Sequence, residues 1–420
     1  MPGFGSTVPP PKPHHQNYRP DEGDSALFSR RSLLSGGTTA LLLGCAGAPG
    51  SPHAANAAIV PAAPSRSPFV ARDGARLVLD GRPYRFVGAN LWYGAYLGAD
   101  LQAAGRERLA RELDRLAALG VTNLRVLASS ENGPLKNSIK PCFRGPGREL
   151  DQKLLGGLDW LLSELGKRGM KAVLYLTNFW EWSGGMATYL YYVSGEYVDM
   201  GDPAHPWPAF PDRTATFVSN AAAVALYHDY VRAVVARTNA LTGLAYRDDP
   251  TIMAWQLCNE PRPGGSDEVM ERQMPAYRAW ARKTAELIRS IDPHHLVSLG
   301  QEGLKGCNER RDFVAQAHEA MDYVTAHIWP QNWGWVDPRD IAGTWNEAAA
   351  RAKEYLDEHV SLARELQKPL VVEEFGFPRD DASYEAGSPT RFREQYYELV
   401  FEGVERNARS GGPLVGSNFW

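Results

Sequence analysis

Two apolar runs of this sequence end in glutamate and together offer a pair of carboxylates. Residues 256–261 read QLCNEP and place Asn259 and Glu260 at the end of the first run. Residues 369–376 read PLVVEEFG and place Glu373 and Glu374 at the end of the second. Paired carboxyl groups can hydrolyse a glycosidic bond, because one protonates the leaving oxygen while the other attacks the sugar carbon or activates water.

The elements that must position these carboxylates alternate along the chain from residue 70 onward. Short apolar runs predict strands at residues 86–90, 121–127, 171–177, 252–257, 296–299, 323–327, 370–373 and 414–419. Amphipathic stretches predict helices at residues 107–119, 154–168, 222–241, 273–291, 345–366 and 391–408. Continuously apolar strands are buried on both faces and indicate a parallel sheet. Eight such strands separated by helices predict an α/β fold, a (β/α)8 TIM barrel.

The main alternative is a doubly wound open sheet, but no glycine-rich phosphate loop follows the first strand. Residues 69–78 with Asp80 and Gly81 predict a small hairpin that closes the barrel floor. The given sequence ends at Trp420, directly after the last strand. We therefore expect that the eighth helix of the barrel is missing from the given chain.

In a TIM barrel the active site lies at the C-terminal ends of the strands. The side chains that the predicted strands place at this rim are those of Arg125, Asn178, Asn259, Glu260, Gln301, Glu302, His327, Glu373, Glu374 and Trp420. Carboxylates, amides, a histidine, an arginine and an aromatic ring are thus predicted to converge on one end of the barrel.

Several segments resemble glycoside hydrolase family 5. Residues 255–262 (WQLCNEPR) resemble its acid/base motif, and residues 371–376 (VVEEFG) resemble its nucleophile motif. A narrower resemblance to the β-mannanases of the family is carried by residues 88–93 (GANLWY), 176–185 (LTNFWEWSGG) and 246–255 (YRDDPTIMAW). The resemblance covers about residues 69–420 and implies a retaining endo-β-1,4-mannanase acting on mannan, glucomannan or galactomannan.

The chemistry and the resemblance together assign roles at the rim. Glu260 is expected to be the acid/base, with a pKa raised by burial and by the negative charge across the cleft. Glu374 is expected to be the nucleophile, kept ionised and oriented by Arg125. Asn259 is expected to bind the sugar 2-hydroxyl. His327 is expected to donate within the same network.

Further substrate contacts are expected from Asn178, Trp92, Trp180, Trp329 and Trp420, the last stacking under the sugar at the cleavage point. Trp329 departs from the family pattern, because most members carry a tyrosine that touches the nucleophile at this position.

Neighbouring residues have less specific expectations. Glu373 is expected to point to the other side of the strand from Glu374 and to act as a structural ion-pair partner. Glu302 remains open between a structural and a functional role. The long aromatic segment 179–217 is expected to wall an open cleft together with Trp333 and Trp335.

Two alternative functions remain. An endo-β-1,4-glucanase of the same family differs in substrate by one axial hydroxyl, which no residue pattern reveals. A lipoprotein that binds glycans without cleaving them would need the aromatic residues but not both Glu260 and Glu374.

Composition bounds the partners of the chain. The 420 residues are 44% hydrophobic and carry a net charge of −4. The basic residues form no cluster in the sequence, so nucleic-acid binding is not predicted. Neither a metal nor an organic cofactor is expected, because hydrolysis by two carboxylates needs none, and no cysteine or histidine spacing indicates zinc. The expected partner is a plant-type β-mannan, and a monomer is expected. Cys142 and Cys307 can be proposed as a disulfide, whereas Cys258 reads as a buried apolar residue.

Residues 1–65 are predicted to be an export signal and a disordered linker, followed by the catalytic domain at 66–420. Arg30 and Arg31 precede an apolar stretch that resembles a twin-arginine signal. This stretch is shorter than the about 20 apolar residues that span a membrane. Cleavage after Ala57 and lipid anchoring at Cys45 remain alternatives, so we expect a secreted or envelope-attached protein.

Overall fold

Eight parallel strands form the core of the computed structural model, which describes residues 67–420. They are β4 (Phe86–Asn90), β5 (Asn123–Leu127), β6 (Lys171–Tyr175), β7 (Ile252–Gln256), β8 (Leu296–Ser298), β9 (Val324–Ile328), β10 (Leu370–Phe375) and β11 (Leu414–Phe419). The hydrogen-bonded order is β8-β7-β6-β5-β4-β11-β10-β9. Every predicted strand is confirmed, with bounds that differ by a few residues.

The strands β8 and β9 meet and complete the barrel. Asp322 N–H donates to Val297 O at 2.8 Å before β9, and His327 N–H donates to Glu302 O at 3.0 Å near its end. The sheet therefore turns back on itself, as the TIM-barrel prediction requires.

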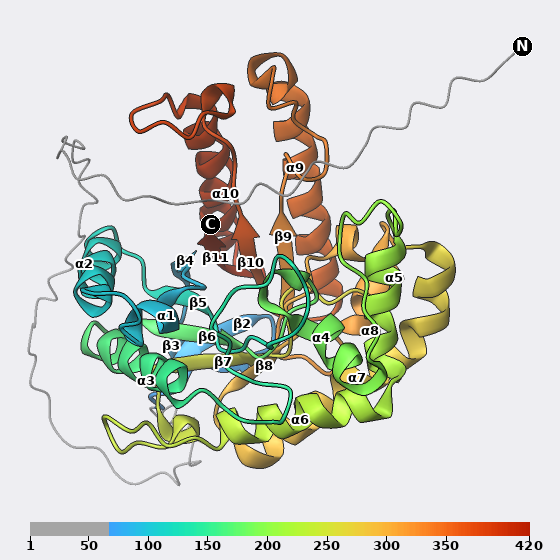
Figure 1. Cartoon of the computed structure of the whole chain (residues 1–420). Helices are drawn as coiled ribbons and strands as arrows, with labels where there is room; N and C mark the ends of the chain where they lie inside the picture. The colour runs from blue at the N-terminus through green and yellow to red at the C-terminus, as the bar shows by residue number, and fades with distance from the viewer. Residues whose placement is uncertain (1–66) are drawn as a thin grey trace, which may run out of the picture. The chain divides into compact units, whose positions relative to one another are not determined.

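Ten α-helices surround the sheet within residues 67–420 (Figure 1). They are α1 (Gly94–Gly98), α2 (Gly105–Ala118), α3 (Gln152–Lys167), α4 (Gly185–Ser194), α5 (Ala209–Ala215), α6 (Ala221–Val235), α7 (Asp267–Ile291), α8 (Arg311–Ala317), α9 (Ile341–Glu365) and α10 (Arg391–Arg409). The six predicted helices correspond to α2, α3, α6, α7, α9 and α10. Side-chain caps define several starts: Asp151 accepts from the first turn of α3, and Ser266 from that of α7.

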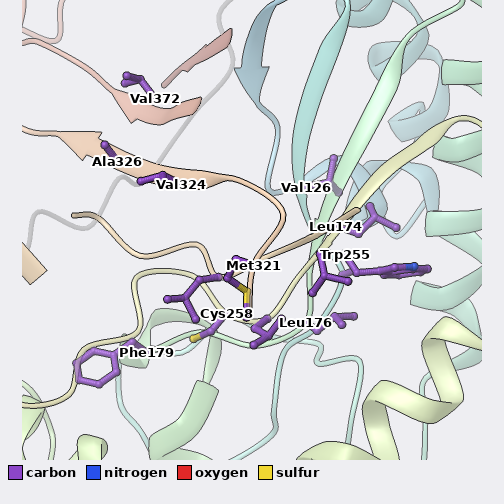
Figure 2. Packing of buried hydrophobic residues seen from close by; sticks show 14 of the residues in the cluster. Val126, Leu174, Leu176, Phe179, Trp255, Cys258, Met321, Val324, Ala326 and Val372 are labelled. Atoms are coloured by element: carbon purple, nitrogen blue, oxygen red, sulfur yellow. The ribbon is translucent and has the colours of Figure 1, made fainter. Parts of the chain in front are cut away.

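Side chains of the strands alternate between two environments. In β5, Leu124 and Val126 face the helices, while Arg125 between them faces the barrel interior. Figure 2 shows the helix-facing layer, with Val126, Leu174 and Trp255 among its members. The period of two along each strand therefore fixes which polar residues enter the barrel.

A small antiparallel sheet of β1 (Ala71–Asp73), β2 (Arg76–Leu79) and β3 (Arg82–Pro83) precedes the barrel. Asp80 and Gly81, both with positive φ, form the predicted turn between β2 and β3. Leu77 packs among apolar residues at the strand starts, and Phe69 stacks on His294 with ring centroids 4.7 Å apart. The predicted closure of the barrel floor is confirmed, with one strand more than a hairpin has.

Two further expectations can be compared with residues 67–420. The proposed Cys142–Cys307 disulfide is wrong: Cys142, Cys258 and Cys307 are all free thiols. Cys307 is buried and accepts from Gln301 Nε2, whereas Cys142 lies on a different loop and contacts Ile139 O. No helix in this part of the chain is long and apolar enough to cross a membrane. The twin-arginine pair, Cys45 and the cleavage site at Ala57 lie outside the described residues.

Candidate active site

Two glutamates meet where β7 and β10 end. Glu260 follows β7, Glu374 lies near the end of β10, and one carboxylate oxygen of each lies within 4.8 Å of the other and of a ring nitrogen of His327. Glu260 has a φ of 50°, in the left-handed region that non-glycine residues rarely occupy. Such local backbone strain is concentrated at functional sites. The structure thus brings together the pair predicted from two segments more than a hundred residues apart.

Glu374 is held by two hydrogen bonds and one ion pair. Arg125 Nη1 donates to its Oε1 at 2.5 Å, Trp329 Nε1 donates to its Oε2 at 3.1 Å, and His327 Nδ1 lies 3.4 Å from Oε2. Trp329 therefore supplies a hydrogen-bond donor to Glu374 from the position that departs from the family pattern. Burial raises the pKa of Glu374, and the charges of His327 and Arg125 partly offset this effect.

Glu260 accepts hydrogen bonds on both oxygens. His327 Nδ1 donates to Oε1 at 2.6 Å and Trp180 Nε1 donates to Oε2 at 2.5 Å. Burial alone would raise the pKa of Glu260, but the hydrogen bond and the charge of His327 lower it overall. The expected raised pKa is therefore corrected for this arrangement, because a cation that the sequence did not place beside Glu260 stabilises its carboxylate.

His327 is the cation shared by these carboxylates. Burial disfavours the charged ring, yet the charge of Glu374 and the hydrogen bond to Glu260 raise the pKa of His327 to about 10. Its Nε2 lies 3.9 Å from Glu373 Oε2. Groups that interact this strongly titrate as a unit, so the proton needed for acid catalysis belongs to the His327–Glu260 pair rather than to one residue.

Arg125 organises the interior side of the site. Its guanidinium is fully buried and donates to Gln256 Oε1 at 2.8 Å, Asn259 Oδ1 at 2.7 Å and Asn90 Oδ1 at 3.2 Å as well as to Glu374. Because the planar guanidinium of Arg125 has a hydrogen-bond acceptor at each of its nitrogens, its orientation is fixed, and this in turn fixes the orientation of Glu374. Gln256 is a participant that the sequence analysis missed, although its inward register on β7 pointed to it.

Asn259 and Asn178 form an amide pair across the ends of β6 and β7. Asn259 Nδ2 donates to Asn178 Oδ1 at 3.1 Å, and Asn178 Nδ2 donates to Ser183 Oγ at 3.0 Å. Asn178 is fully buried and also accepts from Trp180 N–H. Its side chain thus positions Asn259 and Trp180, and the direct substrate contact expected of it stays a prediction.

The expected orientation of Glu373 is wrong. The register of β10 shifts between Val372 and Glu374, so both glutamates face the barrel interior instead of opposite sides. Glu373 accepts from Gln256 Nε2 at 2.7 Å and from Tyr323 OH at 3.1 Å, and lies 3.8 Å from Arg125 Nε. Its expected role as an ion-pair partner is confirmed.

The aromatic residues divide into two edge-on pairs, which contain the expected substrate contacts, and one cluster that packs against α9. Trp420 is 44% exposed and meets Trp329 edge-on at 5.9 Å, and Trp92 meets Trp182 edge-on at 5.6 Å. Trp335, expected in the cleft wall, is instead buried against Tyr355, because the chain after β9 folds back onto α9. Trp333 packs in the same cluster.

Arg262 and Glu302 form a buried ion pair beside Glu260. Arg262 Nη2 lies 2.5 Å from Glu302 Oε1, and its guanidinium lies 5.0 Å from the Trp180 ring centroid. Burial raises the pKa of Glu302 to about 7, although Arg262 opposes the shift. Glu302, left open by the sequence, is therefore a partner of Arg262, which follows Glu260 by two residues and was missed.

Glu131 is a second missed carboxylate, and it fastens the segment after β6. Its Oε2 accepts from Gly185 N–H at 2.7 Å, and burial raises its pKa to about 7. Gly184 has a φ of 91°, and a Cβ there would lie 2.2 Å from Glu131 O. Only glycine fits, so this contact fixes the path of the chain that carries Trp180.

Within residues 67–420, Glu260, His327 and Glu374 are the one group whose donor atoms are close enough to hold a metal ion. Each of these atoms already takes part in the hydrogen bonds and ion pairs described above. The arrangement therefore suits proton and sugar chemistry between two carboxylates. A TIM barrel with opposed glutamates on two strand ends has the parts of a glycoside hydrolase.

Comparison with known proteins agrees with this class. The model of "GH family 5 beta-mannosidase-like" proteins matches residues 67–420. The chain is 30% identical to a putative mannan endo-1,4-β-mannosidase 9 of Oryza sativa over 88% of this chain and 84% of that protein. It is 31% identical to mannan endo-1,4-β-mannosidase 1 of the same species, over 84% of this chain and 78% of that protein. The chain belongs to glycoside hydrolase family 5 and its β-mannosidase-like group.

A solved structure extends the agreement to the fold. The family 5 mannosidase of Rhizomucor miehei matches with a TM-score of 0.75 and 32% identity, over 84% of this chain and 85% of that one. The (β/α)8 architecture and the glycoside hydrolase class predicted from the sequence are confirmed.

Proposed function

We propose that this enzyme is a retaining endo-β-1,4-mannanase that cleaves mannan, glucomannan or galactomannan by double displacement. The observation that carries the proposal is the opposition of Glu260 and Glu374 within 4.8 Å. Retaining glycosidases hold their carboxyl groups about 5–5.5 Å apart, whereas inverting ones need about 6.5–9.5 Å. The relatives named mannan endo-1,4-β-mannosidase support the choice of mannan.

In this proposal Glu374 attacks the anomeric carbon while Glu260 protonates the departing oxygen. Arg125 and Trp329 orient Glu374 and oppose the rise in its pKa that burial causes. Water then attacks the glycosyl-enzyme bond after Glu260 has become the base, which releases the sugar with its original configuration.

His327 supplies the proton that this scheme requires. It shares a 2.6 Å hydrogen bond with Glu260 Oε1. As a sugar covers the cluster and Glu374 begins to bond to the anomeric carbon, the negative charge that favours the imidazolium falls. The proton moves from His327 to Glu260 as the glycosidic bond breaks, and Glu260 passes it to the leaving oxygen in the same step.

Two side chains are proposed to bind the sugar at the cleavage point. Asn259 is held by Arg125 and Asn178 and contacts the 2-hydroxyl, while the exposed face of Trp420 stacks against the ring. Trp92 and Trp180 are proposed to line the same cleft.

Export by the twin-arginine pair at Arg30 and Arg31 remains part of the proposal, since an enzyme acting on polysaccharide must meet its substrate outside the cell.

A second candidate is an exo-acting β-mannosidase on short β-mannosides. The solved structure with a TM-score of 0.75 belongs to a protein called a mannosidase, and the family model carries the same word. The same catalytic pair serves an endo-mannanase and an exo-mannosidase. The two activities differ in whether the cleft is open to a polymer at both ends or closed at one end. An endo-β-1,4-glucanase is the third reading to be tested.

The test is to incubate the purified protein with galactomannan, glucomannan and carboxymethylcellulose and to measure new reducing ends. Release of mixed mannooligosaccharides from galactomannan is expected. Release of mannose alone would favour the exo-acting mannosidase, and activity on carboxymethylcellulose alone the glucanase. Binding without new reducing ends from any polymer would contradict a catalytic function.

A further inference from the structure

An exposed indole lies next to the catalytic cluster without belonging to it. Trp207, in the segment between α4 and α5, leaves 51% of its surface exposed. Single exposed apolar side chains are normal, so this exposure does not by itself mark a binding site. The question is therefore whether Trp207 is held in a fixed position that a ligand could use.

Trp207 is fixed on one side. Its ring is nearly parallel to that of Trp180, at an interplanar angle of 24° with centroids 6.4 Å apart. The Arg262 guanidinium lies 6.0 Å from the Trp207 centroid and 5.0 Å from that of Trp180. Arg262 is itself anchored by the buried Glu302. A preorganised ring binds a flat apolar surface with little further loss of conformational entropy.

The same contacts place Trp207 relative to the bond that is cleaved. Trp180 Nε1 donates to Glu260 Oε2, so Trp180 stands against the acid and Trp207 stands one ring further out. The acid must touch the oxygen of the leaving group. Trp329 and Trp420, by contrast, pack together beside Glu374, where the attacked sugar must lie.

We propose that Trp207 is a stacking platform for the sugar units on the leaving-group side of the cleaved bond, beyond the first unit. The assignment rests on the proposed glycosidase function and adds to it the direction in which the polymer extends. A β-1,4-linked pyranose presents a face of C–H groups that matches an indole surface.

The experiment compares two substrates in wild type, Trp207→Ala and Trp207→Tyr. One substrate is β-1,4-mannohexaose, which can reach Trp207, and the other is 4-nitrophenyl β-mannobioside, which has no sugar after the cleaved bond. The ratio of kcat/KM values, hexaose over aryl substrate, should fall about two- to tenfold in Trp207→Ala, as expected for one stacking contact. Trp207→Tyr should recover most of the ratio.

Tyr384 offers a matched control. It is 74% exposed and lies in the segment between β10 and α10, next to the nucleophile's strand rather than the acid's. Tyr384→Ala should leave the ratio at the wild-type value. An equal fall in this control would overturn the assignment to Trp207.

Two other results would overturn the proposal. One is an unchanged ratio in Trp207→Ala with an unchanged melting temperature. The other is an equal loss on both substrates, which would show that Trp207 supports the cluster rather than the substrate. Failure of the proposed glycosidase function would look different, because wild type itself would then cleave neither substrate.

Discussion

The two ends of the barrel carry almost the same hydrogen-bonded group. Near the floor, Asp292 Oδ2 accepts from His295 Nδ1 at 2.6 Å and from Trp255 Nε1 at 2.7 Å. At the rim, Glu260 accepts from His327 Nδ1 at 2.6 Å and from Trp180 Nε1 at 2.5 Å. A carboxylate, a histidine and a tryptophan thus recur, and only their surroundings differ.

In the group at the floor, each polar side-chain atom has a hydrogen-bond partner within the floor itself. Asp292 Oδ1 also accepts from two backbone N–H groups, and His295 Nε2 is hydrogen-bonded to Asp249 O at 2.9 Å. One carboxylate meets one histidine, and each polar atom has a fixed partner. Such a group stabilises a turn and leaves no capacity for chemistry.

The rim group has more carboxylates than one histidine can neutralise. His327 faces Glu260, Glu374 and Glu373, and Arg125 is the second cation among them. Protons can therefore be redistributed when a sugar enters. The comparison shows that reactivity depends on unequal numbers of charges at an accessible strand end, and not on the types of residue alone.

The largest effect should come from removing the nucleophile. Glu374→Ala should lower kcat on galactomannan by about 10⁴-fold or more, because the covalent step is lost. The melting temperature should change little or rise, since one buried carboxylate of an overcrowded group is removed. Substantial residual turnover would contradict the assignment.

The matching change at the floor should act on stability instead. Asp292→Ala leaves His295 and Trp255 without their acceptor and should lower the free energy of unfolding by about 3 kcal/mol. The kcat of the folded fraction should stay within about twofold of wild type. Urea unfolding with activity measured before denaturation tests both statements, and a large fall in kcat would remove the distinction between the two ends.

Trp329→Phe should have an intermediate effect at the rim. The change removes the N–H that Glu374 accepts at 3.1 Å but keeps an aromatic ring. A hydrogen bond to a charged group contributes about 1.5–3 kcal/mol, so kcat/KM should fall about 10- to 100-fold. An unchanged kcat/KM would show that Arg125 alone holds the nucleophile.

A change of pH should separate the two ends by the sign of its effect on stability. His327 has a folded pKa of about 10, above its unfolded value, so its contribution is complete below pH about 6.5 and is lost as pH rises toward 10. Asp292 has a pKa lowered by His295 despite its burial, so its contribution is lost only below pH about 4. Between about pH 7 and pH 10 the contribution of His327 to the unfolding free energy should fall by at most about 1.4 kcal/mol per pH unit, measured as the difference between wild type and His327→Gln. The unfolding free energy should therefore fall less steeply in His327→Gln than in wild type, and an identical pH dependence of the two proteins would contradict the raised pKa.

The sequence predicted the fold and the catalytic pair because both depend on local patterns. Apolar runs with polar tips identify strands and their C-terminal ends, and this was sufficient to place Glu260, Glu374, Arg125 and His327 on one rim. The orientation of Glu373 was mispredicted because a shift of register in β10 has no sequence signature.

Contacts between distant loops also escaped prediction. Trp180 and Trp329 were expected only to touch substrate, yet they donate to Glu260 and Glu374. Their indole N–H groups reach the carboxylates through loop paths that depend on Glu131 and on packing against α9. The lowered pKa of Glu260 follows from the same kind of long-range contact, with His327.

The most direct test of the account is the configuration of the first product. A proton NMR time course of mannohexaose cleavage resolves the two anomers of the new reducing end before they equilibrate. Opposed attack by Glu374 and protonation by Glu260 predict that the β-anomer appears first. Initial appearance of the α-anomer would show inversion and would contradict the double displacement proposed for this pair.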